Sequence, residues 1–335
     1  MRRRRLAAAF ASCLLIAAAP AVTAPEAGLN SVHPELRSIA RGIMQAQRSG
    51  VTYKPAKPGP LPSGVEERQV PGLRGHPAVP VYVVNAEARQ EPPRGAIYFV
   101  HGGGFIGGDA RENLTALKGL AQRLNCVIVS VQYRLAPATR FPGPLEDAYV
   151  GLKWLHGNAA ALGVDPRRIV VMGESAGGGL AAMLTIAARD RGEVPVAFQA
   201  LVYPMLDDRT GSSRPVPPHI GQLIWTAESN RKGWQALLGR RPGAATQPAG
   251  AVPARVSNLK GLPPTFIGVG SIDLFVDEDV EFARRLINAD VPTELLVVPG
   301  AFHGFQMIVP RAAISQQFNS ALETALSRAL SPEKK

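Results

Sequence analysis

Short runs of β-branched and aromatic residues alternate with longer helical patterns through the chain after about residue 78. The runs are nearly continuously apolar, which is typical of strands that are covered on both faces of a sheet. This alternation predicts an α/β fold with a mostly parallel central sheet flanked by helices. We expect strands at residues 81–84, 96–100, 127–131, 169–172, 198–203, 265–269 and 294–298. We expect helices at residues 112–124, 144–158, 175–191, 278–289 and 311–330.

Two segments do not fit this alternation. Residues 31–47 have the pattern of an amphipathic helix, and residues 205–250 form a Pro/Gly-rich insertion that contains Trp225 and Trp234. A long irregular excursion inside a compact domain is usually functional. We therefore interpret the two segments together as a lid.

The N-terminus has the order of regions found in a secretory signal peptide. The basic start MRRRR precedes an apolar stretch from Leu6 to Ile16, and small residues follow up to Ala24. The apolar part is too short and too interrupted to span a bilayer comfortably. We expect residues 1–24 to be a signal peptide, with cleavage after Ala21 or Ala24, and residues 25–335 to form one exported domain, periplasmic or secreted.

Charge and cysteine content exclude several classes of protein. The formal charge of +11 falls by four with the leader, and the remaining basic residues are dispersed rather than gathered in runs with aromatic residues. This distribution disfavours a nucleic-acid partner. The cysteines are Cys13 and Cys126, so the mature chain has one thiol, no internal disulfide and no Cys-based zinc site.

The most specific motif is the pentapeptide at residues 173–177, Gly-Glu-Ser-Ala-Gly. It lies directly after the strand expected at 169–172 and at the start of the next expected helix. This is the strand–turn–helix context of a nucleophile elbow, in which a strained turn exposes the serine hydroxyl above the sheet. The motif predicts Ser175 as a catalytic nucleophile.

A second glycine-rich motif, His-Gly-Gly-Gly-Phe at residues 101–105, follows the strand expected at 96–100. In elbow hydrolases, the loop after an early strand supplies backbone N–H donors for an oxyanion hole. His101 precedes the serine, whereas elbow hydrolases place the acid and then the histidine after it. We therefore expect His101 to structure the loop and not to act as the base.

Several residues after Ser175 are candidates for the acid and the base. Asp273, Asp277 and Asp279 follow the strand expected at 265–269, and position favours Asp273, because the other two fall where a helix begins. His303 follows the strand expected at 294–298, whereas His219 lies in the insertion. A histidine in the loop after a strand is suited to take the serine proton, with a carboxylate fixing its tautomer.

Five motifs in this order resemble the hormone-sensitive lipase family (class IV) of bacterial carboxylesterases, over about residues 75–310. They are the glycine-rich loop at 101–104, Tyr-Arg-Leu-Ala-Pro at 133–137, the elbow at 173–178, Asp273 with Asp277-Glu278, and His-Gly-Phe at 303–305. Glu174 departs from the family, because many relatives carry Asp there.

The resemblance implies an α/β-hydrolase fold with a mostly helical cap, here from about residues 25–75 and 205–250. It also implies cofactor-free hydrolysis of short acyl esters, without a metal. The implied catalytic residues are Ser175, Asp273 and His303, and the implied oxyanion hole consists of the N–H groups of Gly103, Gly104 and Ala176.

Taken together, these patterns predict an exported serine carboxylesterase that forms an acyl-enzyme intermediate. A lactonase or a deacetylase with the same triad is the alternative, and a non-catalytic binding protein is disfavoured because His303 is present. We expect a small-molecule ester as substrate, no nucleic-acid partner and no stable membrane span in the mature chain, and we leave a homodimer open. Phe105, Trp225 and Trp234 are interpreted either as acyl or lid contacts or as packing residues.

Overall fold

The computed structural model describes residues 28–49, 59–86 and 91–332, which form an α/β fold around one eight-stranded sheet. The strand order is β1-β2-β4-β3-β5-β6-β7-β8. Strands β3 to β8 run parallel to one another, whereas β2 pairs antiparallel with both β1 and β4. The strands are β1 (Val65–Val70), β2 (Val79–Val84), β3 (Arg94–Val100), β4 (Val127–Val131), β5 (Val164–Glu174), β6 (Phe198–Val202), β7 (Thr265–Gly270) and β8 (Thr293–Val298). The mostly parallel sheet predicted from the sequence is confirmed.

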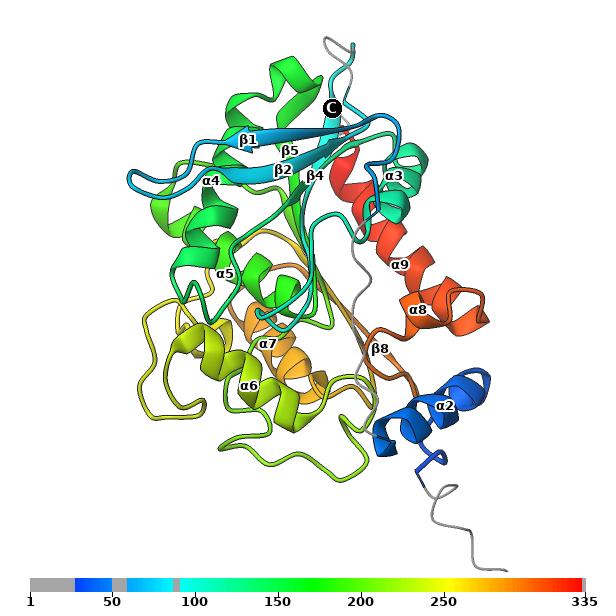
Figure 1. Ribbon diagram of the computed structural model, residues 1–335. Coiled ribbons are helices and arrows are strands. Elements are labelled where there is room, and N and C mark those ends of the chain that lie inside the picture. Colours follow the sequence, from blue (N-terminus) through cyan, green and yellow to red (C-terminus); the bar gives the residue numbers. More distant parts are fainter. Residues whose placement is uncertain (1–27, 50–58, 87–90, 333–335) are drawn as a thin grey trace, which may run out of the picture.

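Helices cover both faces of the sheet (Figure 1). Helices α4, α5, α6 and α7 share one hydrophobic cluster with one face, and α3, α9 and the N-terminal helical segment share a second cluster with the other face. Consecutive side chains of β3 alternate between the clusters, with Tyr98 in the first and Phe99 in the second, as expected for a strand buried on both sides. The helices are α2 (Arg37–Arg48), α3 (Leu114–Arg123), α4 (Gly143–Gly157), α5 (Ala176–Arg191), α6 (Ala227–Leu238), α7 (Val276–Asn288), α8 (Phe305–Ile308) and α9 (Ala313–Leu330), with short 3₁₀ turns η1 (Pro34–Leu36), η2 (Ala160–Leu162) and η3 (Pro253–Arg255).

Strand β1 is the strand that the sequence analysis missed. Its sequence is VEERQV, and only the two end residues are buried. A strand whose four central side chains all face solvent carries no alternating apolar pattern, so nothing in this segment distinguished it from a loop.

The insertion between β6 and β7 contains the ordered helix α6, where the sequence pattern indicated an irregular excursion. Thr226 caps the helix through its hydroxyl, which accepts a hydrogen bond from the Ser229 N–H (3.3 Å), and Gly239 ends it with a left-handed conformation (φ 67°). These start and stop signals are legible in the sequence, and they could have identified the helix.

The N-terminal helix lies against the second face, beside the loop that follows β8 (Figure 1). The His33 N–H donates to the Gly300 carbonyl (2.9 Å), and Glu35 accepts a hydrogen bond from the Ala313 N–H at the start of α9 (2.6 Å). The helix predicted at residues 31–47 is therefore present, as η1 and α2, and it is attached to the sheet edge that carries His303.

The predicted signal peptide at residues 1–24 lies outside the described residues. Among the residues that are described, none of the helices has the length and apolar character needed to cross a membrane.

Candidate active site

Ser175 lies on a sharp turn between β5 and α5. Its backbone has φ 56° and ψ −124°, a conformation that costs a non-glycine residue on the order of 1–3 kcal/mol and persists only where surrounding contacts impose it. The Ser175 N–H donates to the Val202 carbonyl (2.9 Å), and the Ser175 carbonyl accepts from the Met205 N–H (2.9 Å). Gly177 provides the space, because a Cβ there would lie 2.2 Å from the Val100 carbonyl oxygen. The elbow is thus held against the ends of β3 and β6.

The structure brings three of the predicted residues into one hydrogen-bonded chain. Ser175 Oγ and His303 Nε2 are 2.9 Å apart, and His303 Nδ1 and Asp273 Oδ2 are 2.8 Å apart. Asp273 follows β7 and His303 follows β8, so both side chains come from the carboxyl edge of the parallel sheet. All three residues are buried, and the second carboxylate oxygen of Asp273 accepts the Phe275 N–H (3.0 Å).

The remaining candidates lie elsewhere. Asp277 is exposed, and His219 is exposed within the insertion. Asp279 is fully buried, but both of its carboxylate oxygens lack a hydrogen-bond partner among the described residues. Burial, with the nearby carboxyls of Glu278 and Asp273, holds the pKa of Asp279 well above its usual range. The geometry therefore selects Asp273 from the three acids that the sequence left open.

The glycine-rich loop at residues 101–104 lies directly against the elbow, since a Cβ on Gly102 would be 3.4 Å from Ser175 Cβ. The Gly103 carbonyl accepts hydrogen bonds from the N–H groups of Ile106 (3.1 Å) and Gly107 (2.9 Å). In a trans peptide the C=O and N–H groups point in opposite directions, so these bonds aim the Gly104 N–H away from them. Among the described residues, none of the backbone hydrogen bonds outside the helices and strands is donated by the N–H groups of Gly103, Gly104 or Ala176. All three donors are available to a ligand.

His101 fixes the peptide group between Gly102 and Gly103. Its Nδ1–H donates to the Gly102 carbonyl (2.8 Å), which by the same trans-peptide argument orients the Gly103 N–H. The ring stacks on Tyr133, whose hydroxyl donates to the His101 carbonyl (2.9 Å). Desolvation lowers the pKa of His101 to about 4, so the imidazole is neutral near pH 7. This environment suits the loop-structuring role expected from the sequence.

Glu174, the residue before the nucleophile, is a partly buried carboxyl beside the triad. Desolvation raises the pKa of Glu174 to about 7, and the charge of nearby His303 opposes this rise. Its Oε2 accepts a long hydrogen bond from the Asn113 amide (3.5 Å). The carboxyl therefore changes charge in the pH range where a histidine base operates.

Aromatic side chains surround His303, and two of them, Tyr203 and Phe275, were not singled out by the sequence analysis. Tyr203 and Phe275 present their edges to the imidazole at centroid distances of 4.6 and 5.4 Å, and Trp225 lies 6.5 Å away. Trp225 is partly buried at the site, whereas Trp234 is fully buried and packs on Phe105 (5.2 Å). Of the two interpretations considered for Phe105 and Trp234, packing is the one that the structure supports. The only sequence signal for Tyr203 is that it is an aromatic residue at the end of an expected strand. Its contact with His303 follows from the fold and not from a local motif.

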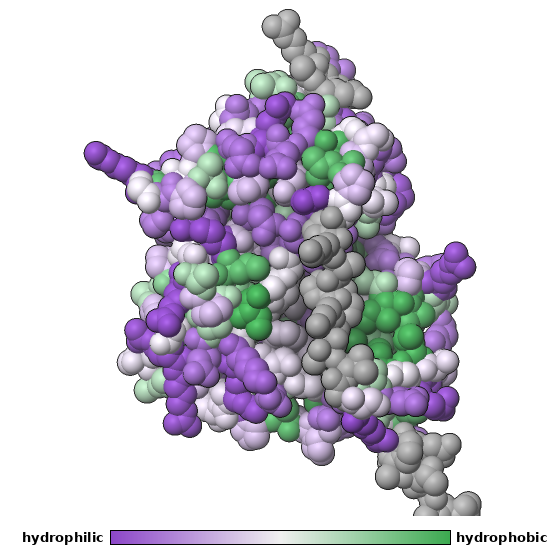
Figure 2. Space-filling view, viewed as in Figure 1, coloured by the Kyte–Doolittle hydropathy of each residue, from purple (hydrophilic) through white to green (hydrophobic). Residues whose placement is uncertain are grey.

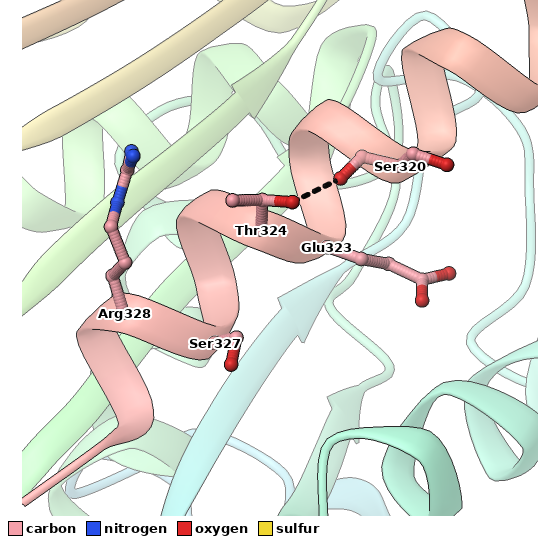
Figure 3. Close-up of a pocket in the computed structure, with 5 residues that line it drawn as sticks. All are labelled: Ser320, Glu323, Thr324, Ser327 and Arg328. Carbon is pink, nitrogen blue, oxygen red and sulfur yellow. Dashed lines mark hydrogen bonds between the residues drawn. The ribbon is translucent and has the colours of Figure 1, made fainter.

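A separate hollow of about 420 Å³ lies along α9, lined by Ser320, Glu323, Thr324, Ser327 and Arg328 (Figure 3). Its two charged residues already have partners, because Glu323 pairs with Arg123 and Arg328 pairs with Glu294. It holds no residue of the triad, and we assign no chemistry to it. Nor do the described residues contain a cluster of His, Cys, Asp or Glu side chains that could hold a metal ion.

Comparison with known proteins agrees with this geometry. Residues 97–307 match the sequence profile of a family described as alpha/beta hydrolase fold. The carboxylesterase NlhH of Mycobacterium tuberculosis is 34% identical over 257 residues, which cover 74% of this chain and 78% of NlhH. An ethyl acetate hydrolase of Pseudomonas putida is 33% identical, over 63% of this chain and 65% of its own length. The solved structure of a bacterial heroin esterase superposes with a TM-score of 0.75 at 34% identity, covering 92% of this chain and 97% of the esterase. The chain therefore belongs to the alpha/beta hydrolase-fold family, and within it the chain is a carboxylic ester hydrolase.

Proposed function

We propose that the protein hydrolyses short-chain carboxylic esters through an acyl-enzyme intermediate on Ser175. The observation that carries this proposal is the continuous chain from Ser175 Oγ through His303 to Asp273, with both links shorter than 3 Å. Nucleophile, base and orienting acid are thereby placed in mutual hydrogen-bond reach, as nucleophilic catalysis requires.

In the acylation step, Ser175 Oγ attacks the ester carbonyl carbon while His303 Nε2 takes the hydroxyl proton. Asp273 accepts the Nδ1–H of His303, which fixes the tautomer and stabilises the imidazolium that forms. The negative oxygen of the tetrahedral intermediate is bound by the N–H groups of Gly103, Gly104 and Ala176, the last at the positive end of the α5 dipole. His303 then gives its proton to the departing alcohol.

In the deacylation step, a water molecule takes the place of the alcohol. His303 Nε2 accepts a proton from the water as its oxygen attacks the acyl carbon, and the same three donors bind the second tetrahedral intermediate. Its collapse returns the proton from His303 to Ser175 Oγ and releases the carboxylic acid, which then loses its remaining proton to solvent. No cofactor is needed for either step.

Two observations favour short, uncharged acyl groups. Ser175 is only 8% exposed, and the Trp225 ring lies close to His303, so space beside the reacting carbonyl is limited. The rings of Phe275 and Trp225 beside His303 make this space apolar. On the surface, apolar side chains gather over α8, the helix that follows the His303 loop, where Met307 and Ile308 are exposed (Figure 2). The relative named for ethyl acetate hydrolysis is consistent with a two-carbon acyl group.

The test is a panel of p-nitrophenyl esters of rising acyl length, assayed beside lactones and acetylated sugars, for the wild type and Ser175→Ala. We expect the highest kcat/KM on short acyl esters and a loss on the order of a million-fold in kcat for Ser175→Ala with an unchanged melting temperature. Retention of more than a few per cent of the rate by pure Ser175→Ala would refute the nucleophile assignment. Preference for lactones or acetylated sugars would support the alternative substrates.

We also propose that the chain is exported, on the basis of its basic start and apolar stretch. N-terminal sequencing of protein recovered from outside the cytoplasm should begin at Val22 or Pro25. Recovery of the protein only from the cytoplasm, with Met1 intact, would contradict the proposal.

A further inference from the structure

Helix α6 lies directly on the oxyanion loop. The closest approach is at Gly233, where a Cβ would be 2.6 Å from the Gly104 carbonyl oxygen. Real Cβ atoms are not found at this distance from an oxygen, so the helix and the loop can be this close only because residue 233 is glycine.

A second contact comes from the turn that precedes α6. The Trp225 ring lies against Gly104, since a Cβ on Gly104 would be 2.2 Å from Trp225 Cη2. The indole Nε1–H donates to Asn230 Oδ1 (3.3 Å). Asn230 is fully buried, and its own amide donates to the Thr210 carbonyl (2.9 Å). A chain of hydrogen bonds inside the insertion therefore fixes the ring that covers Gly104.

Two further contacts hold α6 in place on the core. Trp234 packs on Phe105, the residue directly after Gly104, with both side chains fully buried. At the other end of the helix, the Leu237 carbonyl accepts a hydrogen bond from the Phe141 N–H (2.9 Å). The helix is thus a fixed part of the fold on this side of the site.

We propose that α6 is a positioning element of the oxyanion hole, in which Gly233 and Trp225 hold Gly104 so that its N–H stays aimed at the oxyanion. The proposal rests on the proposed function, because it requires Gly104 to be a donor. The physical reason is the narrow range of useful distances, about 2.7–3.1 Å from donor to oxyanion. A shift of about 1 Å in a catalytic group can cost on the order of 100-fold in rate. A Cβ at Gly233 would meet Gly104 and, at 3.3 Å, the end of the Met205 side chain, but no residue of the triad, so Gly233 is a positioning residue.

The test is Gly233→Ala, assayed with a p-nitrophenyl acetate substrate. The added methyl group must push Gly104 or α6 aside, and we expect kcat to fall by about 10- to 100-fold while KM changes by less than about twofold. Affinity for an alkyl boronic acid, which forms a tetrahedral adduct on the serine, should fall in parallel with kcat. The matched control is Gly157→Ala, at the exposed C-terminal end of α4, where a Cβ would meet nothing within 4 Å. This control should keep wild-type kcat and KM.

A second variant applies if Gly233→Ala does not fold, as judged by circular dichroism and melting temperature. Trp225→Phe removes the Nε1–H bond and shortens the ring at a partly exposed position, and we expect a kcat about three- to tenfold lower on the acetyl ester. Folded Gly233→Ala with wild-type kcat and boronate affinity would overturn the proposal. So would wild-type kcat in Trp225→Phe if Gly233→Ala proves unfolded. Neither result affects the proposed function, which is tested separately by Ser175→Ala and by the substrate panel.

Discussion

The two regions that meet at Ser175 are built in different ways. The loops after β5, β7 and β8 are short, and each projects one residue of the triad from the carboxyl edge of the parallel sheet. The insertion between β6 and β7 is long, and it reaches the site through packing: Trp225 and Gly233 against Gly104, and Trp234 against Phe105.

This difference separates the residues that carry out the reaction from those that shape the site around them. Residues in the sheet loops are placed by strand order and by local motifs, so their chemistry follows from the sequence in their neighbourhood. Residues in the insertion are placed by contacts with segments about 100 positions away in the chain. We therefore expect changes in the sheet loops to cause the largest losses in the rate of the chemical step. Changes in the insertion should alter stability and substrate choice, with smaller losses in kcat where the insertion contacts Gly104.

The largest expected effect in this comparison comes from Asp273→Asn. Asparagine keeps the shape of the side chain, but its NH₂ group can donate a hydrogen bond to Nδ1. This selects the wrong imidazole tautomer and should lower kcat by roughly ten-thousand-fold. The measurement is kcat on p-nitrophenyl acetate with the melting temperature as a folding check.

Two neighbouring acids are the controls for Asp273→Asn. Asp277→Asn changes an exposed side chain, and Asp279→Asn replaces a buried carboxyl, whose pKa burial raises well above its usual range, by an amide of the same shape. Both variants should stay within about tenfold of the wild-type rate. A larger loss in Asp277→Asn than in Asp273→Asn would contradict the geometry of the site.

The sequence predicted the sheet region well and the insertion poorly, for physical reasons. The elbow and the strand-end placement of Asp273 and His303 are local patterns, so the three residues could be named without a fold. Choosing Asp273 over Asp277 and Asp279 depended only on where the next helix begins, and the structure places the start of α7 at Val276. By contrast, no local sequence pattern predicts that Trp225 lies against Gly104 or that Asn230 accepts the hydrogen bond of Trp225. Strand β1 was missed because its central side chains are exposed, and the role of Gly233 depends on a single close approach across the fold.

The two tryptophans of the insertion provide the next test. Trp234→Ala removes a fully buried ring from the core and should lower the free energy of unfolding by about 3–5 kcal/mol. Trp225→Ala removes a partly exposed ring and should cost much less stability, while opening space near His303. Each CH₂ that the enlarged site accommodates should gain about 0.8 kcal/mol, so the optimum acyl length should increase. Urea denaturation and the p-nitrophenyl ester series measure the two effects. If Trp234→Ala shifts the optimum and Trp225→Ala does not, the assignment of the two rings is reversed.

The smallest expected effect concerns Glu174, which belongs to the sheet region but whose contribution is to stability. Its pKa is raised from 4.5 to about 7 by desolvation, so the folded state holds a proton that the unfolded chain has already lost between these two values. Wild-type stability should therefore fall as the pH rises from about 4.5 to about 7 and remain lower above that range. Glu174→Gln removes this ionisation and can still accept the Asn113 hydrogen bond. We expect the free energy of unfolding of the variant to match that of the wild type at pH 4.5 and to exceed it at pH 8 by about 1 kcal/mol, or about 2 °C in Tm, after allowance for solvent screening.

The control is Glu228→Gln, on the exposed face of α6. There the Lys232 ammonium lowers the pKa of the carboxyl, so the sign of the pH dependence is opposite. A Glu174→Gln variant whose Tm advantage is the same at pH 4.5 and pH 8 would show that this carboxyl is not desolvated beside the nucleophile.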